Sequence, residues 1–375
     1  MLAEGMVLPP TKPPRCNLSG SPRIEAIDIQ LKKETIMTGM TRRSALKLSL
    51  GAAIAFPSIL TTTRVFGADF TLKYANNCPE THPLTIRTRE AAAAIKAETN
   101  GKIDLQVFPN SQLGGDTDML AQLRAGGIDF FTLSPLILST LVPKAAVSGI
   151  GFAWSGYDRL WPAMDGKLGE FVRAEIRKSG LYPFEKIFDN GFRQISTSGK
   201  PIKTPEDLAG LKIRVPPSSL WTSMFKAFDA APLSINFSEV YSSLQTRIAD
   251  AQENPLVTFE SAKLYEVQKF VSKTNHMWDG FWFLAGGKTW NKLPADVQKI
   301  IEKHMAAAAQ KEREDVQRLN ASLEKDIAAK GIIFNSVDPA AFQAKLKSKG
   351  FYKEWQAKFG ADLWKLLETS SGLPE

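Results

Sequence analysis

Two arginines occupy similar positions in two short β-like runs of this chain. Arg193 lies in residues 189–197 and Arg214 in residues 211–215, where apolar and basic residues alternate and Lys212 shares a face with Arg214. A guanidinium can bind a carboxylate through two parallel hydrogen bonds. A lone strand arginine is more often a solvated charge, so the pattern alone leaves both interpretations open.

A third candidate is Asn254, which precedes the proline in a Gln-Glu-Asn-Pro string after an expected helix over residues 239–249. The residue before a proline favours an extended backbone, which would turn the Asn254 amide away from that helix. Asn-Pro is also an ordinary turn signal. The two interpretations are not separated by the pattern.

These three residues lie in longer strings that resemble the solute receptors of TRAP (tripartite ATP-independent periplasmic) transporters, the DctP-like family. The strings are NGFRQ from residue 190, KPIKTPEDLAGLKIRVPPS from 200 and FSEVYSSLQTRIADAQENP from 237. The resemblance extends from about residue 69 to the C-terminus. It implies that Arg214 clamps the carboxylate of an organic acid, and that Arg193 and Asn254 contribute to the same pocket.

The resemblance also implies further ligand contacts from two loops, with Asn77 and Asp116 as candidates and Ser134 after the next strand. Phe237 and Trp278 are added as candidate pocket residues. The glycine pair before Asp116 lacks the spacing of a phosphate-binding loop. The alternative for these glycines is a turn, with Asp116 as the helix N-cap.

Composition places the chain among soluble globular proteins, with 43% hydrophobic and 23% charged residues in 375. The net charge is +8, but nine of the 47 basic and four of the 39 acidic residues fall within residues 1–68. The remainder therefore carries +3, which gives little support to a nucleic-acid partner. The two cysteines are Cys16 and Cys78, and removal of the leader would leave Cys78 alone.

Residues 1–68 are interpreted as a leader with an export signal. Arg42 and Arg43 precede an apolar stretch of about 13 residues, which is shorter than the roughly 20 that a membrane-spanning helix needs. The arginine pair indicates the twin-arginine route to the periplasm. The true start could be Met1, Met37 or Met40.

From residue 69 the chain alternates strand and helix, which predicts an α/β fold with a largely parallel sheet. Residues 70–74 alternate like a strand, and Asn100-Gly101 is expected to end a helix over residues 82–99. Thr204 and Pro205 are expected to start a single helical turn. Residues 293–330 are expected to form one long helix or two abutting ones, up to about 55 Å long. With the resemblance, this gives a two-lobed fold resembling periplasmic binding proteins, braced by that helix. The first lobe would comprise residues 69–190 and about 279–315, and the second 191–278 and about 316–375.

The expected function is that of a monomeric periplasmic receptor that delivers a small organic acid to membrane permease subunits driven by an ion gradient. No cofactor or metal is expected, since the three histidines are scattered and no HExxH, nucleotide loop or G-x-S-x-G elbow occurs. A periplasmic enzyme acting on an organic acid and a receptor feeding a sensor remain alternatives. The acid could be a dicarboxylate, a 2-oxo acid, an aromatic acid or a sugar acid.

Overall fold

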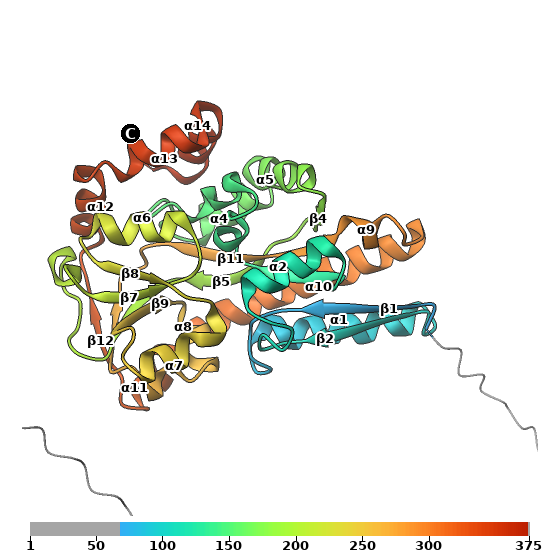
Figure 1. The fold of residues 1–375 in the computed structure, drawn as a ribbon, viewed down its shortest axis with the longest axis horizontal. Coiled ribbons are helices and arrows are strands. Elements are labelled where there is room, and N and C mark those ends of the chain that lie inside the picture. The colour runs from blue at the N-terminus through green and yellow to red at the C-terminus, as the bar shows by residue number, and fades with distance from the viewer. Residues whose placement is uncertain (1–67, 374–375) are drawn as a thin grey trace, which may run out of the picture. The chain divides into compact units, whose positions relative to one another are not determined.

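The computed structural model describes residues 68–373, which contain two six-stranded sheets (Figure 1). In the first sheet the strand order is β2-β1-β3-β11-β4, and β5 pairs with β11. The strands of this sheet are β1 (Phe70–Ala75), β2 (Ile103–Phe108), β3 (Phe130–Leu133), β4 (Leu181–Pro183), β5 (Phe188–Phe192) and β11 (Trp278–Gly286). Alternation of buried and exposed residues in β1 matches the sequence pattern that predicted it.

The three strands from which a largely parallel sheet was predicted are parallel, but the sheet as a whole is mixed. β1 is parallel to β2 and β3, whereas β11 is antiparallel to β3, β4 and β5. Helical crossovers connect the parallel strands, but β11 follows β10 through residues 274–277 without one. The return of the chain to the first lobe near residue 279 was expected, but the β-α-β pattern did not show that β11 would pair antiparallel.

Helices pack against the first sheet and bury a large apolar core. α1 lies against β2, and α2 lies near β3. The helices of this lobe are α1 (Pro83–Glu98), α2 (Asp116–Ala125), α3 (Pro135–Leu138), α4 (Tyr157–Met164), α5 (Lys167–Lys178) and α9 (Gly287–Trp290), with the 3₁₀ helix η1 (Pro143–Gly149).

The second sheet has the order β12-β10-β6-β9-β7-β8 and is also mixed. Its strands are β6 (Gln194–Thr197), β7 (Lys212–Val215), β8 (Ala231–Ser234), β9 (Ala251–Asn254), β10 (Phe270–Lys273) and β12 (Ile333–Ser336). Residues 252–254, expected to terminate a helix, instead form a strand between β6 and β7. Pairing on both sides outweighs the local helical tendency, because strand formation depends strongly on tertiary context.

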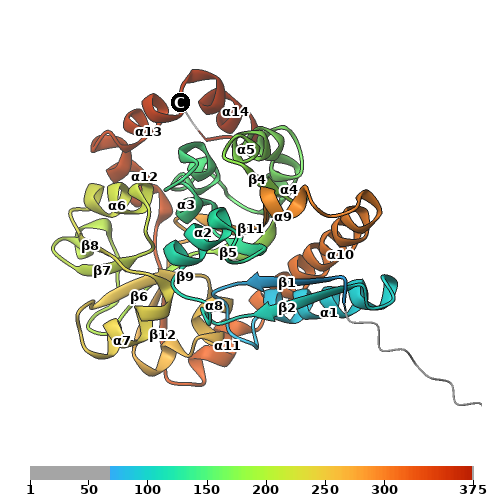
Figure 2. The ribbon, with the colours of Figure 1, turned by 45° about the vertical axis from the view of Figure 1, so that its right-hand side comes forward.

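Helices and short 3₁₀ turns cover this second sheet (Figure 2). α6 packs on β8, α7 contacts β9, and α11 contacts β12. Thr204 precedes the single helical turn η2, as its sequence predicted. These elements are η2 (Pro205–Leu208), α6 (Ser219–Ala227), η3 (Phe237–Glu239), α7 (Val240–Gln245), α8 (Leu256–Ser261) and η4 (Leu264–Glu266).

The long helix contacts elements of both lobes. It is divided into α10 (Ala295–Asn320) and α11 (Leu323–Ala328), so the second of the two expected forms is observed, and α10 spans about 39 Å rather than 55 Å. α10 packs on α1 and β5 and also touches α8. The Glu312 carboxylate accepts a hydrogen bond from the Asp189 amide in β5 at 2.8 Å. The helix is therefore anchored where the chain passes from one sheet to the other.

Three C-terminal helices complete the described residues, namely α12 (Pro339–Ser348), α13 (Phe351–Phe359) and α14 (Ala361–Ser371). α12 and α13 pack on α6, whereas α14 packs on α4 and α5. The tail thus contacts both lobes, and the exact division at residues 190, 278 and 315 stays a prediction. Between residues 68 and 373, no helix has the length and apolar character needed to cross a bilayer. The leader and its arginine pair lie outside the described residues.

Candidate functional site

A cavity lies between loops of the first lobe and the strand ends of the second. The cavity is small in this conformation, with about 20 Å³ open to the centre of a water-sized molecule, so a larger ligand would need the lobes to part before it enters. The first lobe contributes the loop after β1 and the starts of α2 and α3, and the second contributes β7, α6 and β9. Strands β5 and β11 supply the floor where the lobes meet.

Arg214 lines this cavity from β7 with an almost unpaired guanidinium. Its neighbours Ile213 and Val215 are buried in the core on the other face of the strand, and Arg214 itself is only 1% exposed. Its Nε donates to the Ile235 carbonyl at 2.9 Å, but Nη1 and Nη2 are buried without a partner. Burial lowers the pKa of Arg214 to about 9. Two parallel donors on a buried cation suit a carboxylate.

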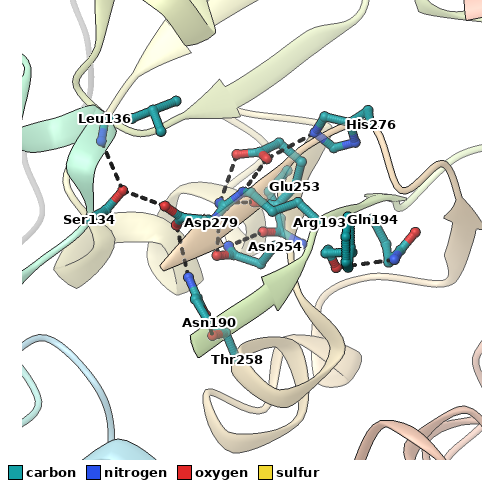
Figure 3. Close-up of polar contacts among 12 residues, drawn as sticks. Ser134, Leu136, Asn190, Arg193, Gln194, Glu253, Asn254, Thr258, His276 and Asp279 are labelled. Atoms are coloured by element: carbon teal, nitrogen blue, oxygen red, sulfur yellow. Dashed lines mark hydrogen bonds and ion pairs between the residues drawn. The ribbon is translucent and has the colours of Figure 1, made fainter. Parts of the chain in front are cut away.

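Arg193 also reaches the cavity, but its donors are largely used inside the protein (Figure 3). Nε and Nη2 bind the Glu253 carboxylate, Nη1 donates to Asp279 Oδ2 at 2.9 Å, and Nη2 also donates to Asn254 Oδ1 at 2.9 Å. Although burial alone would lower the pKa of Arg193, the Glu253 and Asp279 carboxylates raise it. Arg193 is therefore held as the centre of a structural ion network, and its role as a second ligand donor stays a prediction.

Asn254 is fixed in the same network by its position at the end of β9. Its Oδ1 accepts from Arg193, and its Nδ2 donates to Gln252 Oε1 at 2.5 Å. The side chain is 4% exposed and lines the cavity. The structure thus brings together Arg214, Arg193 and Asn254, which lie up to about 60 residues apart in the sequence.

Asp116 and Asn77 face the cavity from the first lobe. Asn77 Nδ2 donates to Asp116 Oδ1 at 2.8 Å, and the Phe237 amide of the second lobe lies 3.5 Å from Asp116 Oδ2. Burial raises the pKa of Asp116 to about 6. The interpretation of Asp116 as a helix N-cap is wrong, because Gly115 takes that position and Asp116 is the first helical residue. Its carboxylate is thereby left to face the cavity.

Ser134 lines the floor, where its hydroxyl already has partners. It donates to Asp279 Oδ1 at 2.7 Å, and it accepts from the Leu136 amide at 3.3 Å as the N-cap of α3 (Figure 3). Its hydroxyl proton is occupied by Asp279. Ser134 therefore links the first lobe to the Arg193 network.

The two aromatic candidates have different positions. Phe237 forms part of the cavity wall, with its ring centre 5.9 Å from the Arg214 guanidinium carbon. Trp278 is buried away from the cavity, where its indole nitrogen donates to Asp189 Oδ1 at 2.8 Å and its ring meets Trp161 edge-on. The expectation of a pocket contact for Trp278 has no support in this placement.

Sequence reasoning missed several residues that line the cavity. Asp279, which is buried and bound by three donors, follows Trp278 directly, so the correct strand was identified but the wrong side chain was chosen. Alternation along that strand could have pointed to Asp279. The other missed lining residues are Cys78, Ile137, Asn190, Pro216, Trp221, Thr258 and Phe281. Residues 68–373 contain no group of three or more His, Cys, Asp and Glu side chains arranged to hold a metal ion.

Comparison with known proteins identifies relatives of this chain. A solute-binding protein of Roseobacter denitrificans is 32% identical over 300 residues, covering 79% of this chain and 90% of that protein. A TRAP periplasmic solute-binding protein from the same species, with bound L-galactonate, has a TM-score of 0.76 at 29% identity, covering 81% of this chain and 99% of that one. A TRAP receptor of Sulfurospirillum deleyianum with bound succinate gives the same TM-score, identity and coverage.

The similarity to these structures covers 81% of this chain, which confirms the two-lobed α/β fold expected from the sequence. Residues 74–358 match the family described as bacterial extracellular solute-binding protein, family 7. This match includes both lobes and every element that contributes to the cavity. The chain belongs to this family of TRAP-transporter solute receptors.

Proposed function

We propose that this protein is a periplasmic receptor that binds a small organic acid in the cavity and delivers it to a TRAP-type permease. The observation that carries the proposal is Arg214, whose Nη1 and Nη2 are buried without a partner beside an otherwise hydrogen-bonded network. A buried donor without a partner costs about 1–3 kcal/mol, and more when it is charged. A ligand carboxylate would remove this penalty and pair both nitrogens.

Contacts across the mouth of the cavity support a receptor that closes on its ligand. Asn236 Nδ2 donates to Thr117 Oγ1 at 3.2 Å, and Asn236 Oδ1 accepts from the Thr117 amide at 3.4 Å. These bonds join the segment before η3, in the second lobe, to the start of α2, in the first lobe. Closure excludes water and so strengthens the contact between Arg214 and an anion.

The decisive experiment identifies what the protein carries. Purified protein is denatured, the released small molecules are identified by mass spectrometry, and each is titrated calorimetrically into ligand-free protein. We expect a carboxylic acid that binds with one-to-one stoichiometry and is recovered unchanged after prolonged incubation. Release of only neutral or cationic molecules, with no acid bound in titrations, would refute the proposal. Conversion of the acid would favour the alternative of a periplasmic enzyme.

The partner and the route of export extend this proposal. Receptors of this family serve membrane transporters, and we propose a monomer that meets its permease in the periplasm; neighbouring genes would distinguish a permease from a sensor as the recipient. The leader would use the twin-arginine route. Replacing Arg42 and Arg43 by Lys should then retain the protein in the cytoplasm, whereas normal periplasmic amounts of the double variant would indicate an ordinary secretory signal.

A further inference from the structure

The charges around the cavity leave one cation for the ligand. Arg193 is shared between two buried carboxylates, Glu253 and Asp279, with Nε, Nη1 and Nη2 all engaged. Arg214 alone, among the cationic residues that line the cavity, keeps both terminal nitrogens free. His276 does not add a charge, because burial lowers its pKa. The cavity can therefore neutralise one ligand carboxylate, but it has no second cation with unpaired donors.

The first-lobe wall of the cavity carries a carboxylate, that of Asp116. Asp116 is fully buried and receives one short hydrogen bond, from Asn77, plus a long one from the Phe237 amide. An ionised carboxylate has about four lone-pair sites, so Asp116 has room to accept from a ligand hydroxyl. A second carboxylate beside it would be a buried like-charge pair, which is strongly unfavourable.

Trp221 provides an additional donor that no prediction from the sequence included. It lies in α6, is fully buried, lines the cavity, and stacks its ring on the Arg193 guanidinium at 4.8 Å. Its indole Nε1 has no hydrogen-bond partner. Arg214 and Trp221 are the residues lining the cavity whose buried side-chain donors lack partners within residues 68–373. An indole N–H only donates, so it requires an acceptor oxygen of the ligand.

From this arrangement we infer that the ligand is a hydroxylated monocarboxylic acid rather than a dicarboxylate. Its carboxylate binds Arg214, one of its oxygens accepts from Trp221, and a hydroxyl donates to Asp116. This inference rests on the proposed function and narrows its ligand class. Hydroxyls suit the site because each can donate to an acidic wall and accept from an indole without adding charge.

A matched ligand panel tests the inference. Galactonate, galactarate and hexanoate share a six-carbon chain, and erythronate, succinate and butanoate share a four-carbon chain; in each set the hydroxy acid is compared with a diacid and an unsubstituted acid. Calorimetry at pH 8, where Asp116 is ionised, should give at least tenfold tighter binding to the hydroxy monoacid of the preferred length. That ratio corresponds to about 1.4 kcal/mol.

Two variants connect the preference to the residues. Trp221→Phe keeps the ring over Arg193 but removes the N–H, and should weaken binding of the hydroxy acid about tenfold. Trp282→Phe is the matched control, because Trp282 is equally buried, also has an unpartnered indole nitrogen, and does not line the cavity. Asp116→Asn removes the negative wall and should reduce the preference for the monoacid over the diacid several-fold.

The outcomes separate the inference from the proposed function. Tighter binding of succinate or galactarate than of the matching hydroxy monoacid overturns the inference, while loss of that binding in Arg214→Ala would uphold the receptor. Equal effects of Trp221→Phe and Trp282→Phe overturn the role of the indole. If no acid of either set binds the wild-type protein, the inference is overturned, whereas the proposed function is decided separately by whether the protein releases a bound acid on denaturation.

Discussion

The two arginines at the cavity should respond to substitution in opposite ways, because one is held by carboxylates and the other is not. Removal of Arg193 leaves Glu253 and Asp279 buried without their cation. Breaking a buried pair in this way costs about 3–5 kcal/mol of folding free energy. Removal of Arg214 loses a single hydrogen bond of about 1 kcal/mol, to the Ile235 carbonyl, but also removes two buried donors that have no partner, so the stability of ligand-free protein should stay near the parental value or rise.

Ligand binding should show the converse pattern at Arg214. Arg214→Met leaves a ligand carboxylate buried without its partner, which at about 3–5 kcal/mol weakens binding by roughly two to three and a half orders of magnitude. Arg214→Lys should recover only part of the lost affinity, because an ammonium group keeps the charge but cannot form the two parallel hydrogen bonds of a planar guanidinium. Lys212→Ala is the control, since Lys212 is exposed and its ion-pair contact with Asp250 is 3.5 Å long; surface changes of this kind cost less than about 0.5 kcal/mol.

The assays are denaturant unfolding of ligand-free protein and calorimetric titration of the identified acid, for Arg193→Met, Arg214→Met, Arg214→Lys and Lys212→Ala. We expect low stability only for Arg193→Met and low affinity with near-parental stability for Arg214→Met. If Arg214→Met bound the acid within a few-fold of the parent, the carboxylate clamp would be disproved. Near-parental stability of Arg193→Met would contradict the structural role of its ion network.

Three further predictions concern closure and titration. A Cβ on Gly115 would lie 3.0 Å from the Asn236 amide of the other lobe. Gly115→Val should therefore weaken ligand binding about tenfold while leaving the stability of ligand-free protein unchanged. Unaltered affinity would show that close contact between Gly115 and Asn236 is not needed for closure. Cys78 lines the cavity and is 2% exposed, so saturating ligand should slow its alkylation at least tenfold by peptide mass spectrometry, and equal rates would contradict closure over the site. Burial raises the pKa of Asp189 to about 7, from about 3.9 in an unfolded chain. The folded state thus binds more protons between these pH values, so the free energy of unfolding should fall as pH rises from 4 to 7. In Asp189→Asn the difference in unfolding free energy between pH 5 and pH 8, measured with denaturant, should be smaller. An unchanged difference would assign the titration to other groups.

Local sequence signals predicted the elements that depend on neighbouring residues. The alternation at residues 70–74, the Asn-Gly stop after α1 and the Thr-Pro start of η2 each depend on contacts within a few residues, and the structure has these elements there. Arg214 was identified because its strand alternates and its string resembles a known family. The local pattern could not show that its terminal nitrogens are unpaired, since this depends on every element around the cavity.

The errors concern long-range contacts. Glu253 and Asp279 lie 60 and 86 residues from Arg193, so no local pattern shows that they occupy its donors. Residues 252–254 form a strand because β6 and β7 pair on either side of them. Trp278 is an aromatic residue of the kind that often lines pockets, yet its indole N–H is hydrogen-bonded to Asp189. In each case the partner that decides the role is supplied by another part of the fold.

Arg193 is held in an ion network, whereas Arg214 keeps unpaired donors, and this difference explains how the site can be rigid and still bind a charged ligand. Arg193 lies between β5 and β6, and its network joins β5, β9 and β11 and reaches α3 of the first lobe through Ser134. The floor of the cavity is thus fixed by bonds that do not involve ligand. Movement is then needed only at the walls, where the segment before η3 meets the start of α2. A prearranged floor reduces the ordering cost of binding, so the free energy of pairing the ligand carboxylate with Arg214 is available for closing the lobes.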